Sequence, residues 1–203
     1  CLVGSEMCIR DRLSTEGAKV FAREVAQYCK AYNLDGVNYD DEYSLYPDLG
    51  NPSFATPSAQ AGARLCYETK QVMPDKLVTV FAYGNMYGVE SVDGVDVDEW
   101  IDIVVPNYGS AAYPLGNMDK WKCAGLAAEF NLHGGGSLDS YGAQKILSGG
   151  YGWHMGFAAN PNNYTTIFQR LSGAYELYGS KLKDPTIFYK KNETTPSKYP
   201  EDL

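Results

Sequence analysis

The order of apolar and polar positions along the chain predicts short buried strands that alternate with amphipathic helices. Strand side chains alternate with a period of two, whereas one face of a helix recurs every three to four residues. Short apolar runs predict strands at residues 34–40, 77–83, 101–108, 126–131 and 152–158. Helical spacing predicts helices from Ser14 or Thr15 to Asn33, from Ser58 to Met73, through Ile146 and Leu147 to Gly149, and from Ile167 to Tyr178. This alternation argues for an α/β fold with a parallel sheet and helices outside it.

The inward faces of the first two helices follow from the same spacing. We expect Asn33 to end the first helix in a left-handed conformation, and Ser58 to cap the second. The expected inward residues are Phe21, Val25, Tyr28, Cys29 and Tyr32 in the first helix, and Ala61, Leu65 and Val72 in the second. The loop 43–57 carries three prolines and is expected to face substrate, because it follows an acidic strand end.

The run LDGVNYDDEYS at residues 34–44 combines a buried strand with a burst of carboxylates. Alternation puts Val37 and Tyr39 on one face, suited to packing against helices. The opposite face carries Gly36, Asn38, Asp40 and Glu42. Asp40 and Glu42 would be neighbours there, so ionising one makes ionising the other harder and a proton tends to stay on the pair. Such a pair can supply a general acid near neutral pH.

Charge and composition exclude several classes of partner. The 203 residues carry a formal net charge of −8, which argues against nucleic acid and anionic membranes. The sequence contains no run of 18 apolar residues, so no membrane span is predicted. Twenty-seven aromatic residues, of which 17 are tyrosines, could stack on sugars or simply pack.

The first twelve residues, CLVGSEMCIRDR, are expected to be a translated sequencing-adapter artefact rather than part of the fold. We therefore expect three regions: an artefactual leader at 1–12, an α/β domain at 13–180, and a closing segment or linker at 181–203. Setting the leader aside leaves Cys29, Cys66 and Cys123, whose scattered spacing fits neither disulfides nor a zinc site. We expect them to be small core residues.

Two further patterns could carry chemistry but favour simpler interpretations. Residues 92–99, VDGVDVDE, could form a calcium loop, yet a loop or short helix leading into a strand is the favoured interpretation. His133 and His154 could form a metal pair, but separate structural histidines are favoured. The triple glycine at 134–136 favours a tight turn, because no phosphate-loop lysine follows it. We therefore expect no metal and no cofactor.

Residues 35–42, DGVNYDDE, resemble the signature of glycoside hydrolase family 18, Asp-Gly-Xaa-Asp-Xaa-Asp-Xaa-Glu. Asn38 stands where that family usually has Asp, and Asp41 stands where its chitinases typically have Trp. The ending Asp-Asp-Glu-Tyr is similar to the Endo H-like branch of endo-β-N-acetylglucosaminidases. The resemblance implies that 13–180 is the C-terminal part of a TIM-barrel glycosidase domain, a partial TIM (β/α)8 barrel with roughly strands four to eight and the N-terminal part missing. The alternative is a chance acidic strand end or a calcium loop.

The resemblance also implies a function. The expected reaction is cleavage of the GlcNAc-β1,4-GlcNAc core of N-glycans, in which the substrate's own acetamide forms an oxazolinium intermediate. Glu42 would be the general acid, Asp40 would stabilise the oxazolinium, and Tyr108 would hold the acetamide. Expected substrate-binding residues are Asn38, Tyr43, Asn107, Asn131, Trp153 and Asn160. The alternatives are a chitinase-like hydrolase and a non-catalytic glycan-binding barrel.

The expected setting of the complete protein follows from the same resemblance. Its partner would be an N-glycan or glycoprotein substrate, and it would act as a monomer. We expect it to be secreted or on the cell surface of a bacterium, with a lipoprotein anchor as one option.

Overall fold

The computed structural model of the chain describes residues 12–40, 58–82, 88–129, 138–157 and 164–179. None of the helices in these ranges is long and apolar enough to cross a membrane. Single 3-10 turns lie at Val97–Glu99 and Lys120–Lys122. The helices and strands follow in the order α1 Thr15–Ala31, β1 Gly36–Tyr39, α2 Ala59–Val72, β2 Leu77–Phe81, β3 Ser91–Val92, β4 Val95–Asp96, β5 Ile103–Val105, β6 Ala124–Glu129, α3 Ser140–Ser148, β7 Trp153–Phe157 and α4 Tyr164–Leu177.

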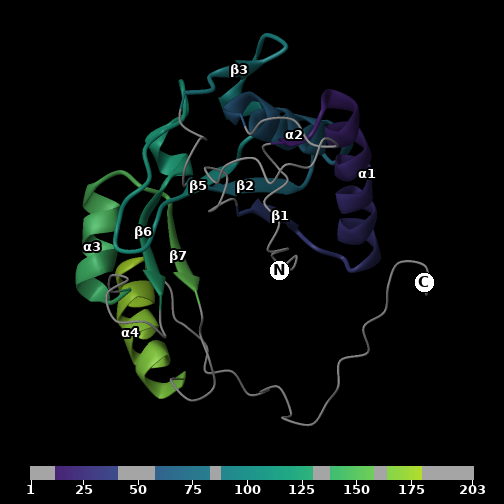
Figure 1. Cartoon of the computed structure of the whole chain (residues 1–203). Helices are drawn as coiled ribbons and strands as arrows, with labels where there is room; N and C mark the ends of the chain where they lie inside the picture. Colours follow the sequence, from purple (N-terminus) through teal and green to yellow (C-terminus); the bar gives the residue numbers. More distant parts are fainter. Residues whose placement is uncertain (1–11, 41–57, 83–87, 130–137, 158–163, 180–203) are drawn as a thin grey trace.

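The long strands are parallel and lie side by side in chain order. β1, β2 and β5 form one sheet, in which Asn38 pairs with Thr79 and Thr79 pairs with Ile103. β6 and β7 form a second parallel pair, and a parallel bridge between Val104 and Cys123 joins the two sheets. Helices α1 and α2 lie beside β1 and β2, while α3 and α4 lie together beside β6 and β7 (Figure 1). The predicted α/β class is confirmed, and within the described ranges the strands do not close into a barrel.

The helix ends follow the predicted capping chemistry. The Ser14 hydroxyl accepts a hydrogen bond from Gly17 N at 3.1 Å, and the Ser58 hydroxyl accepts one from Ala61 N at 3.2 Å. Asn33 has φ 51°, so it leaves the first helix in the predicted left-handed conformation. These contacts satisfy backbone groups that each helix terminus leaves without an intrahelical partner.

The predicted inward stripes are wrong at their last members. Tyr32 is 42% exposed and Val72 is 40% exposed, because each stands at the end of its helix, where packing against the neighbouring helix ceases. Val25, Cys29 and Leu65 are buried as predicted, and the small residues Ala18 and Ala22 complete the buried face of α1 and let α2 approach closely. The buried residues are Ala18, Ala22, Val25 and Cys29 in α1, and Gly62, Ala63, Leu65, Cys66, Glu68 and Thr69 in α2.

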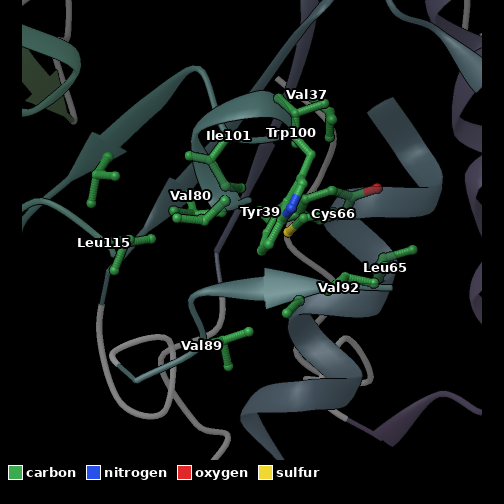
Figure 2. Packing of buried hydrophobic residues seen from close by; sticks show 14 of the residues in the cluster. Val37, Tyr39, Leu65, Cys66, Val80, Val89, Val92, Trp100, Ile101 and Leu115 are labelled. Atoms are coloured by element: carbon green, nitrogen blue, oxygen red, sulfur yellow. The ribbon is translucent and has the colours of Figure 1, made fainter. Parts of the chain in front are cut away.

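The main core lies between these helices and β1, β2 and the connection into β5. Trp100 is fully buried at its centre, near Tyr39 and Cys66 (Figure 2), and its indole N–H donates to Val95 O at 3.1 Å. Cys29, Cys66 and Cys123 are all buried free thiols, as predicted. Burial raises the pKa of the Cys123 thiol to about 11, which keeps it protonated and inert at neutral pH.

The segment before β5 agrees with its prediction in part, because Val97–Glu99 forms a short 3-10 helix that leads toward the strand. Residues 91–96 form a β-hairpin, which the repeated Asp pattern did not suggest, and Asp93 occupies its turn with φ 52°. The predicted strand 101–108 shortens to β5, because Ile101 is buried in the preceding turn, where its N–H donates to Val97 O at 2.9 Å. The buried apolar run at 101–108 therefore contains the connection before the strand as well as the strand itself. The described residues contain no cluster of three or more His, Cys, Asp or Glu that could hold a metal, so the calcium alternative gains no support.

Gly36 lets β1 approach β2 so closely that a side chain would not fit. A Cβ atom at this position would overlap the carbonyl oxygen of Leu77 and lie 2.7 Å from Leu77 N. We therefore expect Gly36→Ala to lower the free energy of unfolding by about 1–3 kcal/mol, because backbone atoms cannot move aside as a flexible side chain would. Chemical denaturation of the full-length protein containing this chain measures the change.

Gly173→Ala is the matched control for this substitution. A Cβ at Gly173, within α4, would meet Ser140 at an ordinary 3.7 Å. Alanine is favoured over glycine in helix interiors, so this control should be neutral or slightly stabilising. Equal stability of the two variants would contradict the steric role of Gly36.

Candidate active site

The two faces of β1 are separated as the alternation predicts. Val37 and Tyr39 are buried in the core, and the Tyr39 hydroxyl hydrogen bonds to Thr69 Oγ1 of α2 at 2.7 Å. Thr69 in turn donates to Leu65 O at 2.8 Å, so the buried face of β1 is anchored to α2. Asn38 and Asp40 consequently face away from the helices and are exposed. Glu42 and Tyr43 lie outside the described residues.

A hydrogen bond between adjacent strands orders the exposed face. The Thr79 hydroxyl of β2 lies 2.8 Å from Asn38 Oδ1, to which it donates, and 3.3 Å from Val37 O. Asn38 and Thr79 are direct partners in the parallel register, so backbone pairing brings the two side chains together. The Asn38 side chain is therefore oriented from the neighbouring strand.

Tyr108 follows β5 in a turn that is tied to the next strand. Asn107 Oδ1 accepts a hydrogen bond from Tyr108 N at 2.7 Å, so the amide oxygen of Asn107 is engaged by the adjacent backbone. Gly109 has φ 76°, and its N–H donates to Ala127 O of β6 at 2.8 Å. This backbone contact fixes where the turn sits. Since β2 lies between β1 and β5, Tyr108 follows a strand that is two places away from the strand of Asp40.

An aromatic row links the carboxyl ends of the strands. The Tyr108 ring lies 6.1 Å from the Phe81 ring at the end of β2, and 5.9 Å from the Phe157 ring at the end of β7, measured between centroids. Tyr39 pairs with Val80, so continuing the register places Asp40 beside Phe81. Phe157 is 53% exposed, which leaves an apolar ring facing solvent at this edge. An exposed aromatic face suits contact with a sugar ring.

Phe81 and Phe157 were absent from our sequence-based site. Their positions could have identified them. Both are the last residues of their strands, and both lie on the strand face that points away from the outer helices. Catalytic groups of parallel α/β folds gather at the carboxyl ends of strands, so a search restricted to these positions would have found both.

Other predicted residues are not brought to this edge. Trp153 begins β7 and pairs with Ala124 at the start of β6, so it lies at the amino end of its strand. Its role in substrate binding stays a prediction. Asn131 and Asn160 lie outside the described residues.

His154 faces the helical side of β7 rather than the exposed edge. His154 Nδ1 lies 3.2 Å from the Tyr178 hydroxyl, and the rings of Tyr175 and Tyr178 pack against the imidazole. Burial lowers the pKa of His154, which favours the neutral ring inside this packing. These contacts agree with the structural role expected for it, and its suggested metal partner His133 lies outside the described residues.

The strand ends place a carboxylate and aromatic side chains at one edge of the sheet. Asp40 can present a carboxylate at the edge where the exposed Phe157 ring supplies aromatic surface and Tyr108 supplies a phenolic hydroxyl, while the buried Phe81 ring lies against Tyr108. The sequence places Glu42 two residues further on. Such a constellation can stabilise a developing positive charge and donate a proton.

The chain as a whole is similar to known glycan-degrading proteins. No protein-family model matches the chain. Endo-β-N-acetylglucosaminidase F1 of Elizabethkingia meningoseptica is 39% identical over 188 residues, which are 89% of this chain and 55% of that protein. A probable chitinase of Penicillium expansum is 28% identical over 100 residues, 49% of this chain and 7% of that protein.

The solved structures of a Bacteroides thetaiotamicron protein, EndoBT-3987, are similar over nearly the whole chain. One crystal structure contains a Man5GlcNAc product and shares 68% identity at a TM-score of 0.80, covering 95% of this chain and 45% of that one. A second contains a Man9GlcNAc2Asn substrate and shares 67% identity at the same TM-score, covering 95% and 49%. The chain spans about half the length of the proteins it matches at these levels. By sequence and by fold, it is related over that shared half to the Endo H-like endo-β-N-acetylglucosaminidases.

Proposed function

We propose that the full-length protein containing this chain hydrolyses the GlcNAc-β1,4-GlcNAc bond in the core of N-glycans. The observation that carries this proposal is the position of Asp40, on the exposed face at the carboxyl end of β1 and in register beside the aromatic row of Phe81, Tyr108 and Phe157. The match to EndoBT-3987, solved with oligomannose-type product and substrate, supports the substrate class.

The proposed mechanism uses the substrate's own acetamide as the nucleophile. Its carbonyl oxygen attacks C1 of the sugar, while Glu42 donates its proton to the glycosidic oxygen and the bond to the leaving GlcNAc breaks. Asp40 stabilises the positive charge that develops on the oxazolinium ring, and the Tyr108 hydroxyl holds the acetamide. Water then opens the ring at C1, giving its proton to the Glu42 carboxylate and restoring the acid.

The proposed architecture of the complete enzyme is a TIM barrel in which the described parallel strands are strands four to eight. The order of the strands and their outer helices supports this, because barrels of this kind place active sites at the carboxyl ends of their strands. For the complete protein we propose a secreted or cell-surface bacterial location and a monomeric state.

Substrate preference is the direct test of this proposal. We expect the full-length protein to release a high-mannose glycan from a glycopeptide and to leave chitin oligomers nearly untouched, because Asp41 replaces the Trp typical of chitinases. Chromatographic separation of released glycan and of chitin fragments, at equal enzyme and substrate concentrations, measures both reactions.

Two results would redirect the assignment. Comparable rates on the two substrates would favour a chitinase-like hydrolase, to which the Penicillium expansum similarity points. Retention of glycopeptide on immobilised protein without release of glycan would favour a glycan-binding barrel.

A further inference from the structure

A cluster of three side chains joins the end of α4 to β7, close to the amino end of that strand. We propose that the docking of the C-terminal half of α4 is an acid-sensitive switch, in which a neutral His154 ring holds α4 against β7 and a proton on that ring releases it. None of the side chains in this cluster belongs to the residues proposed for hydrolysis, so the switch is independent of the proposed function.

The His154 ring of β7 contacts two tyrosines of α4. The rings of His154 and Tyr178 are stacked, with 5.7 Å between their centroids and 26° between their planes. The Tyr175 ring lies 6.3 Å from the imidazole and at 71° to it. His154 Nδ1 also lies 3.2 Å from the Tyr178 hydroxyl, so the tie between helix and strand is polar as well as aromatic.

The cluster accommodates a neutral imidazole better than a charged one. A neutral imidazole has one N–H donor and one acceptor nitrogen, so Nδ1 can bond to the Tyr178 hydroxyl whichever group donates. A protonated ring has two N–H donors and a charge that burial disfavours, and burial accordingly lowers the pKa of His154. Burial and the neighbouring Tyr175 raise the pKa of Tyr178, so its hydroxyl stays protonated at neutral and acidic pH.

The elements packed around His154 supply it with no ion pair to a carboxylate among the described residues. The register of β6 and β7 places Gly125 and Leu126 beside His154, and neither residue titrates. The charged residues of α3 and α4 are exposed or engaged at a helix end: Lys145, Arg170 and Glu176 are exposed, and Asp139 caps α3 by accepting from Gly142 N at 3.0 Å. A proton on His154 would therefore be uncompensated in the docked state.

α4 also has an attachment that does not titrate. Ile167 is buried, and Leu171 packs against the apolar cluster that α3 forms with β6. Acid therefore loosens the C-terminal half of α4 without detaching the whole helix. Phe157 lies on the opposite face of β7 beside Tyr108, so the loosened segment backs a strand of the candidate site.

The pH window of the switch follows from the lowered pKa of His154. Above about pH 6.5, the ordinary pKa of histidine, neither the docked nor the open state binds the proton, and the contact has its full strength. As the pH falls below that value, the open state binds a proton that the docked state excludes, so opening becomes more favourable by up to about tenfold per pH unit. Below the lowered pKa of docked His154, both states are protonated and the loss levels off.

Amide hydrogen exchange in the full-length protein tests the switch without an activity assay. Protection factors, corrected for the intrinsic pH dependence of exchange, are compared between residues 171–178 of α4 and helix α1 in the same molecules. Between about pH 7.5 and about pH 5.5, the ratio of α4 to α1 protection should fall by up to about tenfold in the parent protein. In His154→Gln, whose side chain cannot take up the proton, the ratio should stay constant.

Tyr178→Phe is the companion variant, because it keeps the ring and removes only the hydroxyl. It should lower α4 protection already at neutral pH and lose more in acid, since His154 is intact. If His154→Gln does not fold, His154→Phe replaces it, because Phe keeps a ring against the tyrosines and has no proton to gain. An unchanged ratio in the parent, or the same fall in the parent and in the His154 variant, would overturn the proposal. A ratio that rises in acid would also overturn it, because the tyrosine rings would then stabilise the charged imidazole.

Discussion

Glu42→Gln in the full-length protein is expected to lower the rate of N-glycan hydrolysis by about 10²–10⁴-fold, the usual cost of losing a general acid. Gln has nearly the same shape but cannot protonate the leaving glycosidic oxygen. The variant should also fail to couple a supplied oxazoline, because ring opening by an acceptor hydroxyl needs the same residue as a base. Both rates are measured by chromatography of the glycan products.

Glu24→Gln is the matched control for Glu42→Gln. Glu24 is an exposed carboxylate on α1, so its replacement by Gln makes the same chemical change away from the candidate site. The control should hydrolyse and couple like the parent. If Glu42→Gln coupled oxazoline efficiently but hydrolysed glycan poorly, Glu42 would have the role assigned to Asp40.

The part of the site that sequence could predict depends on period-two alternation in one strand. Val37 and Tyr39 are apolar and must be buried, which leaves Asn38 and Asp40 on the opposite face, where the structure places them. The helix caps were predictable for a similar local reason, since Ser14 and Ser58 each satisfy a backbone N–H three residues ahead. These features depend on local geometry, so they can be predicted without knowing how the rest of the chain folds.

The features that sequence missed depend on contacts between distant segments. Ile101 is as apolar as a strand residue, yet it lies in a buried turn, because hydrophobicity alone does not distinguish a strand from a buried connection. Phe157 reaches Tyr108 only because β6 and β7 pair and the second sheet lies beside β5. Trp153 was predicted for the site although it stands at the amino end of β7, whereas Phe157 stands at the carboxyl end, beside Tyr108.

The side chains on the two faces of β1 both make hydrogen bonds that restrain the strand next to the Asp40 carboxylate. The Tyr39 hydroxyl is fixed to Thr69 on the buried side of β1, while Thr79 engages Asn38 on the exposed side. The strand is therefore restrained on both faces immediately before Asp40. Preorganisation of this kind reduces the reorganisation required when charge develops in the transition state.

Asp40→Asn is expected to lower glycan hydrolysis by at least as much as Glu42→Gln, about 10²–10⁴-fold or more, because preorganised electrostatics is often the largest single contribution to catalysis. The substitution removes the negative charge that offsets the oxazolinium as it forms. A supplied oxazoline has already passed that barrier, and Glu42 is intact. The variant should therefore still transfer the oxazoline to an acceptor GlcNAc, and the coupled product should accumulate because hydrolysis is slow.

Asp75→Asn is the matched control, since Asp75 is an exposed carboxylate just before the amino end of the neighbouring strand β2. It should hydrolyse glycan like the parent, which would show that the effect depends on the carboxyl end of β1. If Asp40→Asn makes no coupled product while Glu42→Gln makes it readily, the roles of Asp40 and Glu42 are reversed. Hydrolysis at the parent rate by both site variants would place catalysis elsewhere in the protein.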